Sequence, residues 1–106
     1  MQPHRYTRLH NFLNEFAKVL ELSDRVFITP IYTAREEYNG VDHNTLLQKI
    51  KENGKIEASF VKNAEDLAEK IKFLIQPGDF IIFLGAGDIT QWAYSLPELL
   101  TQELER

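Results

Sequence analysis

The segment of residues 2–8, near the start of the chain, is rich in cationic side chains and contains no acid. It places His4, Arg5 and Arg8 just before a predicted helix. A guanidinium binds a carboxylate or phosphate through two parallel hydrogen bonds, and the start of a helix adds free N–H groups. The pattern therefore indicates an anion site, and a solvated basic surface is the alternative.

A glycine-rich turn follows the most apolar run of the chain, and its residues are Gly85, Ala86, Gly87 and Asp88. Ligands of open α/β sheets bind at the carboxyl ends of parallel strands, where this turn is expected to lie. The turn matches only the first half of a G-x-G-x-x-G dinucleotide fingerprint, because the sixth position is Thr90. The alternatives are a tight turn that needs glycine dihedrals, and an N-cap role for Asp88.

Two further groups of polar residues lie between the first and second predicted strands. Arg35 is followed by Glu36 and Glu37, which indicates either a ligand-facing loop or a surface ion-pair cluster. Asp42 and His43 suit a proton relay, although an N-cap role for Asp42 is the favoured interpretation.

The periodicity of apolar residues predicts the elements that position these groups. Helices are predicted over residues 8–22 and 43–53, and from an N-cap at Asn63 through the apolar positions of residues 67–75. A last helical region is predicted after residue 88, with a restart near 96. Strands are predicted over residues 25–29, 56–60 and 80–84. This alternation predicts a three-layer α/β domain with a mostly parallel sheet, in which residues 80–84 are buried on both faces. We also expect the first strands of a larger sheet to be missing, because no strand precedes the first helix.

The composition bounds the class of protein. A length of 106 residues corresponds to one small domain, and a net charge of −4 argues against nucleic-acid binding. The lack of cysteine excludes disulfides, thiolate zinc sites and cysteine nucleophiles, and the three histidines have no metal-ligand spacing. The longest apolar run is far shorter than the roughly 20 residues that span a bilayer. With no secretory signal in view, the expectation is a cytoplasmic protein that binds no membrane.

The order of three motifs resembles the C-terminal domain of the Mur ligase family over nearly the whole chain. These motifs are the Gln-Pro-His-Arg-Tyr-Thr-Arg opening, the Ile-Tyr-Thr-Ala-Arg-Glu-Glu segment of residues 31–37, and the Pro-Gly-Asp turn whose following strand leads into Gly-Ala-Gly-Asp-Ile. The resemblance implies that residues 1–106 are part of a Rossmann-like domain that closes over the active site and helps to hold the amino acid. The family joins an amino acid to a UDP-muramyl precursor of peptidoglycan after ATP has phosphorylated the precursor's carboxylate.

The resemblance also implies ligands and roles. L-alanine and UDP-N-acetylmuramate would be the substrates of the full-length enzyme, which would use ATP and Mg²⁺. Arg5 and Arg8 would bind the carboxylate of L-alanine, His4 would shape the pocket, and Arg35 and the turn of residues 85–88 would line it. No P-loop is present, so the missing N-terminal and central domains would hold the nucleotide, and this chain alone is expected to bind no cofactor and to be inactive. The alternative is a stand-alone, non-enzymatic α/β module that binds a small anion or a protein partner.

Overall fold

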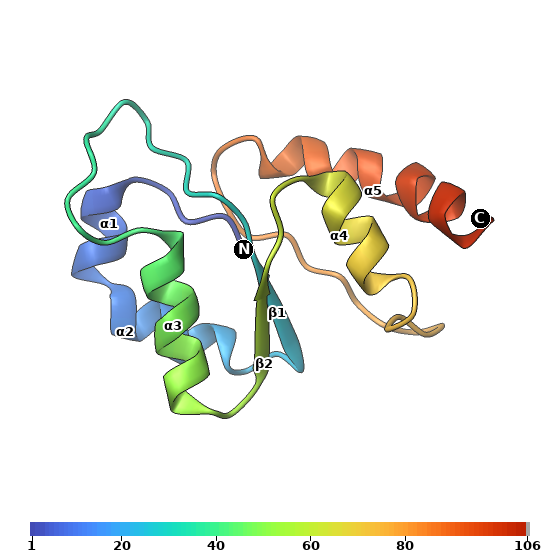
Figure 1. Cartoon of the computed structure of the whole chain (residues 1–106), viewed down its shortest axis with the longest axis horizontal. Coiled ribbons are helices and arrows are strands. Elements are labelled where there is room, and N and C mark those ends of the chain that lie inside the picture. Colours follow the sequence, from blue (N-terminus) through green and yellow to red (C-terminus); the bar gives the residue numbers. More distant parts are fainter. Residues whose placement is uncertain (106) are drawn as a thin grey trace.

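The computed structural model describes residues 1–105, which form five helices and two strands (Figure 1). In chain order these are α1 (Tyr6–Asn11), α2 (Leu13–Leu20), β1 (Arg25–Ile28), α3 (His43–Asn53), β2 (Glu57–Phe60), α4 (Ala64–Ile71) and α5 (Ile89–Leu104). The two strands pair in parallel, with Arg25 opposite Glu57 and Ile28 opposite Phe60. The α/β class predicted from the sequence is confirmed, whereas the larger sheet of a complete three-layer fold is not present in the described residues.

Helices cover both faces of β1, because successive side chains of a strand point to opposite sides. Val26 and Ile28 pack into a cluster with buried residues of α1, α2 and α3. Phe27, which lies between them, packs against a second cluster that includes Leu67 of α4 and Leu96 of α5. Figure 1 shows the corresponding arrangement, with α1–α3 on one side of the strands and α4 and α5 on the other.

The best-predicted elements are those with local capping signals. The helix predicted over residues 43–53 has these bounds in the structure. The Asp42 side chain accepts hydrogen bonds from the backbone N–H groups of Asn44 and Thr45, and Gly54 ends the helix with a left-handed φ of 67°. Asn63 caps α4 by accepting from the N–H of Asp66 at 2.8 Å. The N-cap interpretations of Asp42 and Asn63 are therefore confirmed.

Three helix boundaries differ from the predictions. The single helix predicted over residues 8–22 is two helices, separated at Phe12, and each places buried residues in the same cluster. Helix α4 ends at Ile71 and is followed by a turn, although apolar spacing continues to residue 75. Helix α5 is continuous through Pro97, so the predicted restart near residue 96 is wrong.

The prediction that residues 80–84 form a buried strand is wrong. These residues lie outside the sheet, and the side chains of Phe80 and Ile82 are 92% and 72% exposed. Only the end of the run has a strand-like contact, where the carbonyl of Leu84 accepts a hydrogen bond from the N–H of Gln2 at 2.8 Å. An apolar sequence supplies the side chains of a buried strand, but a strand also needs neighbours that pair with its backbone.

Candidate functional site

A cleft of about 370 Å³ lies where the strands end. Its walls come from residues 30–35 after β1, Lys62 after β2, and Asp88 after the apolar run; the lining residues are Gln2, Pro30, Ile31, Tyr32, Thr33, Ala34, Arg35, Lys62, Asp88 and Trp92. Parallel strands end at one edge of a sheet, and segments distant in sequence meet there. This is the edge at which the sequence predicted a ligand site.

His43 holds the loop that forms one wall of the cleft. Its Nδ1 accepts a hydrogen bond from the N–H of Ile31 at 3.1 Å, and its ring stacks on Phe60 with centroids 5.1 Å apart. Further along this loop, Ala34 and Arg35 have φ values of 52° and 68°. Such left-handed conformations are strained for residues with a side chain, and the fixed loop maintains them. The histidine therefore positions the loop, and the Asp42 carboxylate is engaged in capping α3 rather than in a relay.

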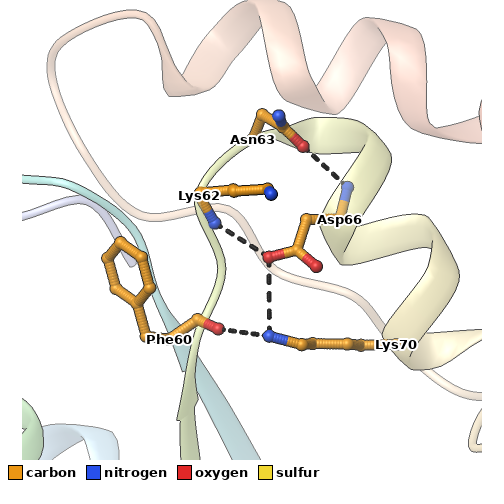
Figure 2. Close-up of polar contacts among 5 residues, drawn as sticks. All are labelled: Phe60, Lys62, Asn63, Asp66 and Lys70. Atoms are coloured by element: carbon orange, nitrogen blue, oxygen red, sulfur yellow. Dashed lines mark hydrogen bonds and ion pairs between the residues drawn. The ribbon is translucent and has the colours of Figure 1, made fainter.

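Lys62 reaches the cleft because the start of α4 is tightly fixed (Figure 2). The Asp66 carboxylate accepts the backbone N–H of Lys62 at 3.0 Å and lies 3.4 Å from the amine of Lys70. The same amine donates to the carbonyl of Phe60 at 2.7 Å. These bonds join the end of β2 to α4 and fix the backbone at Lys62, whose exposed side chain adds a cationic group to the cleft lining.

The chain start runs along the same loop. His4 forms an isolated parallel bridge with Tyr32, and their rings stack with centroids 5.3 Å apart and an interplanar angle of 6°. The N–H of Arg5 donates to the carbonyl of Tyr32 at 2.7 Å. The Nδ1 atom of His4 is buried and has no hydrogen-bond partner within residues 1–105. His4 therefore lies behind Tyr32, one of the residues that line the cleft.

The start of α1 already has an anionic partner from within the chain. The Glu36 carboxylate accepts the backbone N–H of Thr7 at 3.1 Å and its hydroxyl at 2.8 Å. These hydrogen bonds lower the pKa of Glu36, and the positive charge of Arg5 contributes to the same effect. The opening segment has no acid in sequence, but the fold brings this acid to it. The N–H of Thr7 is therefore not free to bind an external anion, as the sequence predicted for the start of this helix. The guanidinium groups of the opening segment remain as candidate anion ligands.

Three arginines keep their side chains available near this edge. Arg5, Arg8 and Arg35 are exposed, and none of them forms an ion pair within the described part of the chain. The alternative of a surface ion-pair cluster around Arg35 is therefore not what the structure contains. Of the three, Arg35 lines the cleft, while Arg5 directly precedes α1 and Arg8 lies within it.

The turn of residues 85–88 packs closely against the chain start. A Cβ at Gly87 would lie 2.6 Å from the ring of Tyr32, and one at Gly85 would lie 3.1 Å from the Gln2 side chain. Close approach is therefore the reason for both glycines, and their close neighbours are parts of the chain itself. Ala86 is exposed on the same turn and does not line the cleft.

Gln2 joins this turn to the chain start, and its side chain was not predicted from the sequence as a site residue. Its Oε1 accepts the N–H of Ile89 at 3.2 Å, and its Nε2 donates to the Asp88 carboxylate. The Asp88 side chain accepts no capping bond from α5, so the N-cap alternative is wrong as a side-chain cap. Gln2 is only 4% exposed. The one feature of the sequence that could have indicated its role is that a neutral amide stands within an otherwise basic motif. Lys62 was also missed, although its place after a predicted strand could have indicated it.

Among the described residues, no group of three or more acidic or histidine side chains is arranged to hold a metal ion, and no helix is both long and apolar enough to cross a membrane. Gln2, Lys62, Arg35 and Asp88 instead give the cleft polar groups of both charges.

These features define an α/β domain with a polar cleft at the carboxyl edge of a parallel strand pair. No family model matches the chain. It is 44% identical over 104 residues to the UDP-N-acetylmuramate–L-alanine ligase of Brucella anthropi and 44% identical over 100 residues to that of Mesorhizobium japonicum. The ligase of Brucella ovis is 43% identical over 104 residues.

These alignments cover 97%, 93% and 97% of the chain but only 22% of each relative. The chain thus spans about a fifth of the length of the ligases that it matches. The resemblance to Mur ligases is confirmed, and the alternative of a stand-alone binding module has no support from these relatives.

Proposed function

We propose that this chain is the C-terminal, amino-acid-binding portion of a cytoplasmic, ATP-dependent ligase that adds L-alanine to UDP-N-acetylmuramate in peptidoglycan biosynthesis. The observation that carries the proposal is the 44% identity over 97% of the chain to a protein named for this reaction. In this proposal, residues 1–106 are a partial closing domain. The N-terminal and central domains of the longer protein hold the UDP-sugar, ATP and Mg²⁺, and the isolated chain is inactive.

The proposed role of the arginines is to hold the carboxylate of L-alanine. Arg5 and Arg8 are exposed and not engaged in ion pairs within residues 1–105, which leaves their guanidinium groups available to a carboxylate. Arg35 and Lys62 add positive charge at the adjacent cleft. Fixing the carboxylate would orient the amine of L-alanine toward the acyl phosphate, and such positioning supplies a large part of a rate enhancement.

The remaining predicted residues shape this site. His4 supports Tyr32 through ring stacking, and the turn of residues 85–88 approaches Tyr32 through Gly87. In this proposal neither group takes or gives a proton during the reaction. Their contribution is a wall of fixed shape beside the guanidinium groups, which would favour a small amino acid over a larger one.

The experiment that tests the proposal grafts the 104 matched residues into the Brucella anthropi ligase in place of the corresponding segment. We expect the chimera to release phosphate in a manner that depends on L-alanine and UDP-N-acetylmuramate. Arg5→Ala or Arg8→Ala in the chimera should lower kcat/KM for L-alanine by roughly 10- to 150-fold, since a charge-assisted hydrogen bond contributes about 1.5–3 kcal/mol.

Lysine at either position should restore activity only in part, because it keeps the charge and loses the two-point geometry. The matched control is Arg25→Ala at the other end of β1, where the guanidinium pairs with Glu57 on the surface. This control should leave the L-alanine dependence unchanged. A rise in the KM for ATP with an unchanged KM for L-alanine would identify the arginines as phosphate ligands and contradict the assignment.

A further inference from the structure

The chain contains two Asn-Gly pairs, Asn39–Gly40 and Asn53–Gly54, and the fold gives them different surroundings. The first lies in the loop between β1 and α3, which Figure 1 shows as a wide arch away from the strands. The second lies at the end of α3, where Asn53 is the last helical residue and Gly54 is the C-cap. An asparagine followed by glycine is prone to succinimide formation, because no side chain on the glycine hinders attack by its nitrogen. The tertiary structure therefore decides which of the two pairs reacts.

The Asn39 side chain is folded against the peptide that follows it. Its Oδ1 accepts a hydrogen bond from the N–H of Val41 at 3.1 Å, which is an Asx-turn. This bond closes a ring that contains both the Cγ of Asn39 and the nitrogen of Gly40. The turn therefore holds the electrophilic carbon beside the nitrogen that must attack it. The N–H of Val41 is also placed to stabilise negative charge on Oδ1 as that nitrogen adds.

The backbone nitrogen of Gly40 is accessible to solvent and not engaged. Asn39 and Gly40 are both exposed, and a Cβ at Gly40 would meet nothing within 4 Å. Within residues 1–105, the N–H of Gly40 donates no hydrogen bond. Attack requires this nitrogen to lose its proton to a base in the solvent, and its exposure allows that transfer.

Asn53 is held in a conformation that prevents the same reaction. The N–H of Gly54 donates to the carbonyl of Ile50 at 3.3 Å, and the Nδ2 of Asn53 donates to the carboxylate of Glu21. Side chains of an α-helix also tilt toward its N-terminus, which carries the Asn53 carboxamide away from the nitrogen that follows it. Succinimide formation at Asn53 therefore requires the last turn of α3 to open first.

We propose that Asn39 is a site of spontaneous covalent modification, at which the folded chain converts asparagine to aspartate and isoaspartate while Asn53 is protected. The deprotonated nitrogen of Gly40 forms a bond to the Cγ of Asn39, and the Cγ–Nδ2 bond breaks. The Nδ2 group takes a proton from water and leaves as ammonia, which gives a cyclic succinimide. Water then adds to one of the two imide carbonyls and breaks its C–N bond, which yields either aspartate or isoaspartate. The proposal does not rest on the enzymatic function.

Either product changes the loop that carries Arg35. Aspartate adds a negative charge to a loop that already contains Glu36 and Glu37. Isoaspartate also inserts a methylene group into the main chain, shortly before Asp42 caps α3. The reaction therefore modifies the segment that joins one wall of the cleft to the start of α3.

The test follows both sites in the 106-residue chain during incubation at mildly alkaline pH, in native buffer and in concentrated guanidinium chloride. Trypsin separates the sites, because Asn39 falls in the peptide of residues 36–49 and Asn53 in that of residues 52–55. Mass spectrometry with fragmentation then locates and quantifies each conversion. In the denatured chain the two sites should react at similar rates.

In the folded chain, Asn39 should react at least about tenfold faster than Asn53, because only Asn53 needs local opening first. The rate at Asn39 should also stay within about tenfold of its rate in the denatured chain. Asn39→Gln should abolish conversion in the peptide of residues 36–49, since the longer side chain would have to form a larger ring. The matched control, Asn53→Gln, should leave that conversion unchanged.

Three results would each overturn the proposal. The first is a smaller ratio between the native rates of Asn39 and Asn53. The second is a stronger protection of Asn39 by folding than the limit given above. The third is conversion in the peptide of residues 36–49 that persists in Asn39→Gln, which would assign the reaction to Asn44.

Discussion

Replacing Gln2 with alanine tests whether the cleft depends on the hydrogen bonds between the start of the chain and the start of α5. The Gln2 side chain accepts the N–H of Ile89 at 3.2 Å and donates to the carboxylate of Asp88, 86 positions away in sequence. Its removal would leave the N–H of the buried Ile89 without this acceptor and the carboxylate without its donor. The prediction therefore concerns the attachment of the chain start to the start of α5.

The two losses set the size of the effect. A buried donor left without a partner costs about 1–3 kcal/mol, and a hydrogen bond to a charged group contributes about 1.5–3 kcal/mol. Because the Asp88 carboxylate is exposed and can be rehydrated, we expect a total loss near the lower end, about 2–4 kcal/mol of unfolding free energy. With a urea m-value of about 2 kcal/mol/M, the unfolding midpoint of Gln2→Ala should fall by about 1–2 M.

The assay is urea unfolding of the chain, followed by circular dichroism, with Gln91→Ala as the matched control. Gln91 is an exposed glutamine on α5, and its substitution should change stability by no more than about 0.5 kcal/mol. A second variant, Gln2→Glu, keeps an acceptor for Ile89 but places a carboxylate against Asp88, so it should regain stability as the pH falls below about 4. A Gln2→Ala midpoint equal to that of the control would refute the reasoning.

Three further outcomes are expected. Gly87→Ala should destabilise the chain by about 1–3 kcal/mol, measured by urea unfolding, because the added Cβ would lie 2.6 Å from the ring of Tyr32. Burial lowers the pKa of the Met1 amine from 8.0 to about 6 in the folded chain, so the unfolded chain binds more protons between these values. The free energy of unfolding should therefore rise between pH 6 and pH 8, by up to about 2–3 kcal/mol, and acetylation of the amine should remove this rise. The purified chain alone should release no phosphate from ATP above a heat-inactivated control, since it has no P-loop.

Each of these three predictions can be contradicted by a specific measurement. An unfolding midpoint of Gly87→Ala equal to that of the original chain would show that the contact with Tyr32 is unimportant. Stability that is flat between pH 6 and pH 8 would mean that the Met1 amine is not buried, and measurable ATP turnover by the isolated chain would contradict its predicted inactivity.

Features that depend on neighbouring residues could be predicted from the amino-acid sequence alone. Helix α3 was predicted with its correct ends because Asp42 binds N–H groups two and three residues away and Gly54 supplies the left-handed conformation that ends the helix. The α/β class followed from the alternation of periodic segments. The resemblance to Mur ligases followed from the order of short motifs, and the identity to three ligases confirmed it.

Features that depend on distant partners required the packing of the whole chain. Glu36 reaches Thr7 across 29 positions, and it occupies the helix start that the basic opening was expected to leave free. Residues 80–84 have the apolar side chains of a buried strand, yet they are not paired in the sheet. A strand of a sheet also requires hydrogen bonds to a neighbouring backbone, and the side-chain pattern does not specify that neighbour. Apolar periodicity reports which side chains avoid water, whereas the tertiary arrangement decides which backbone lies beside them.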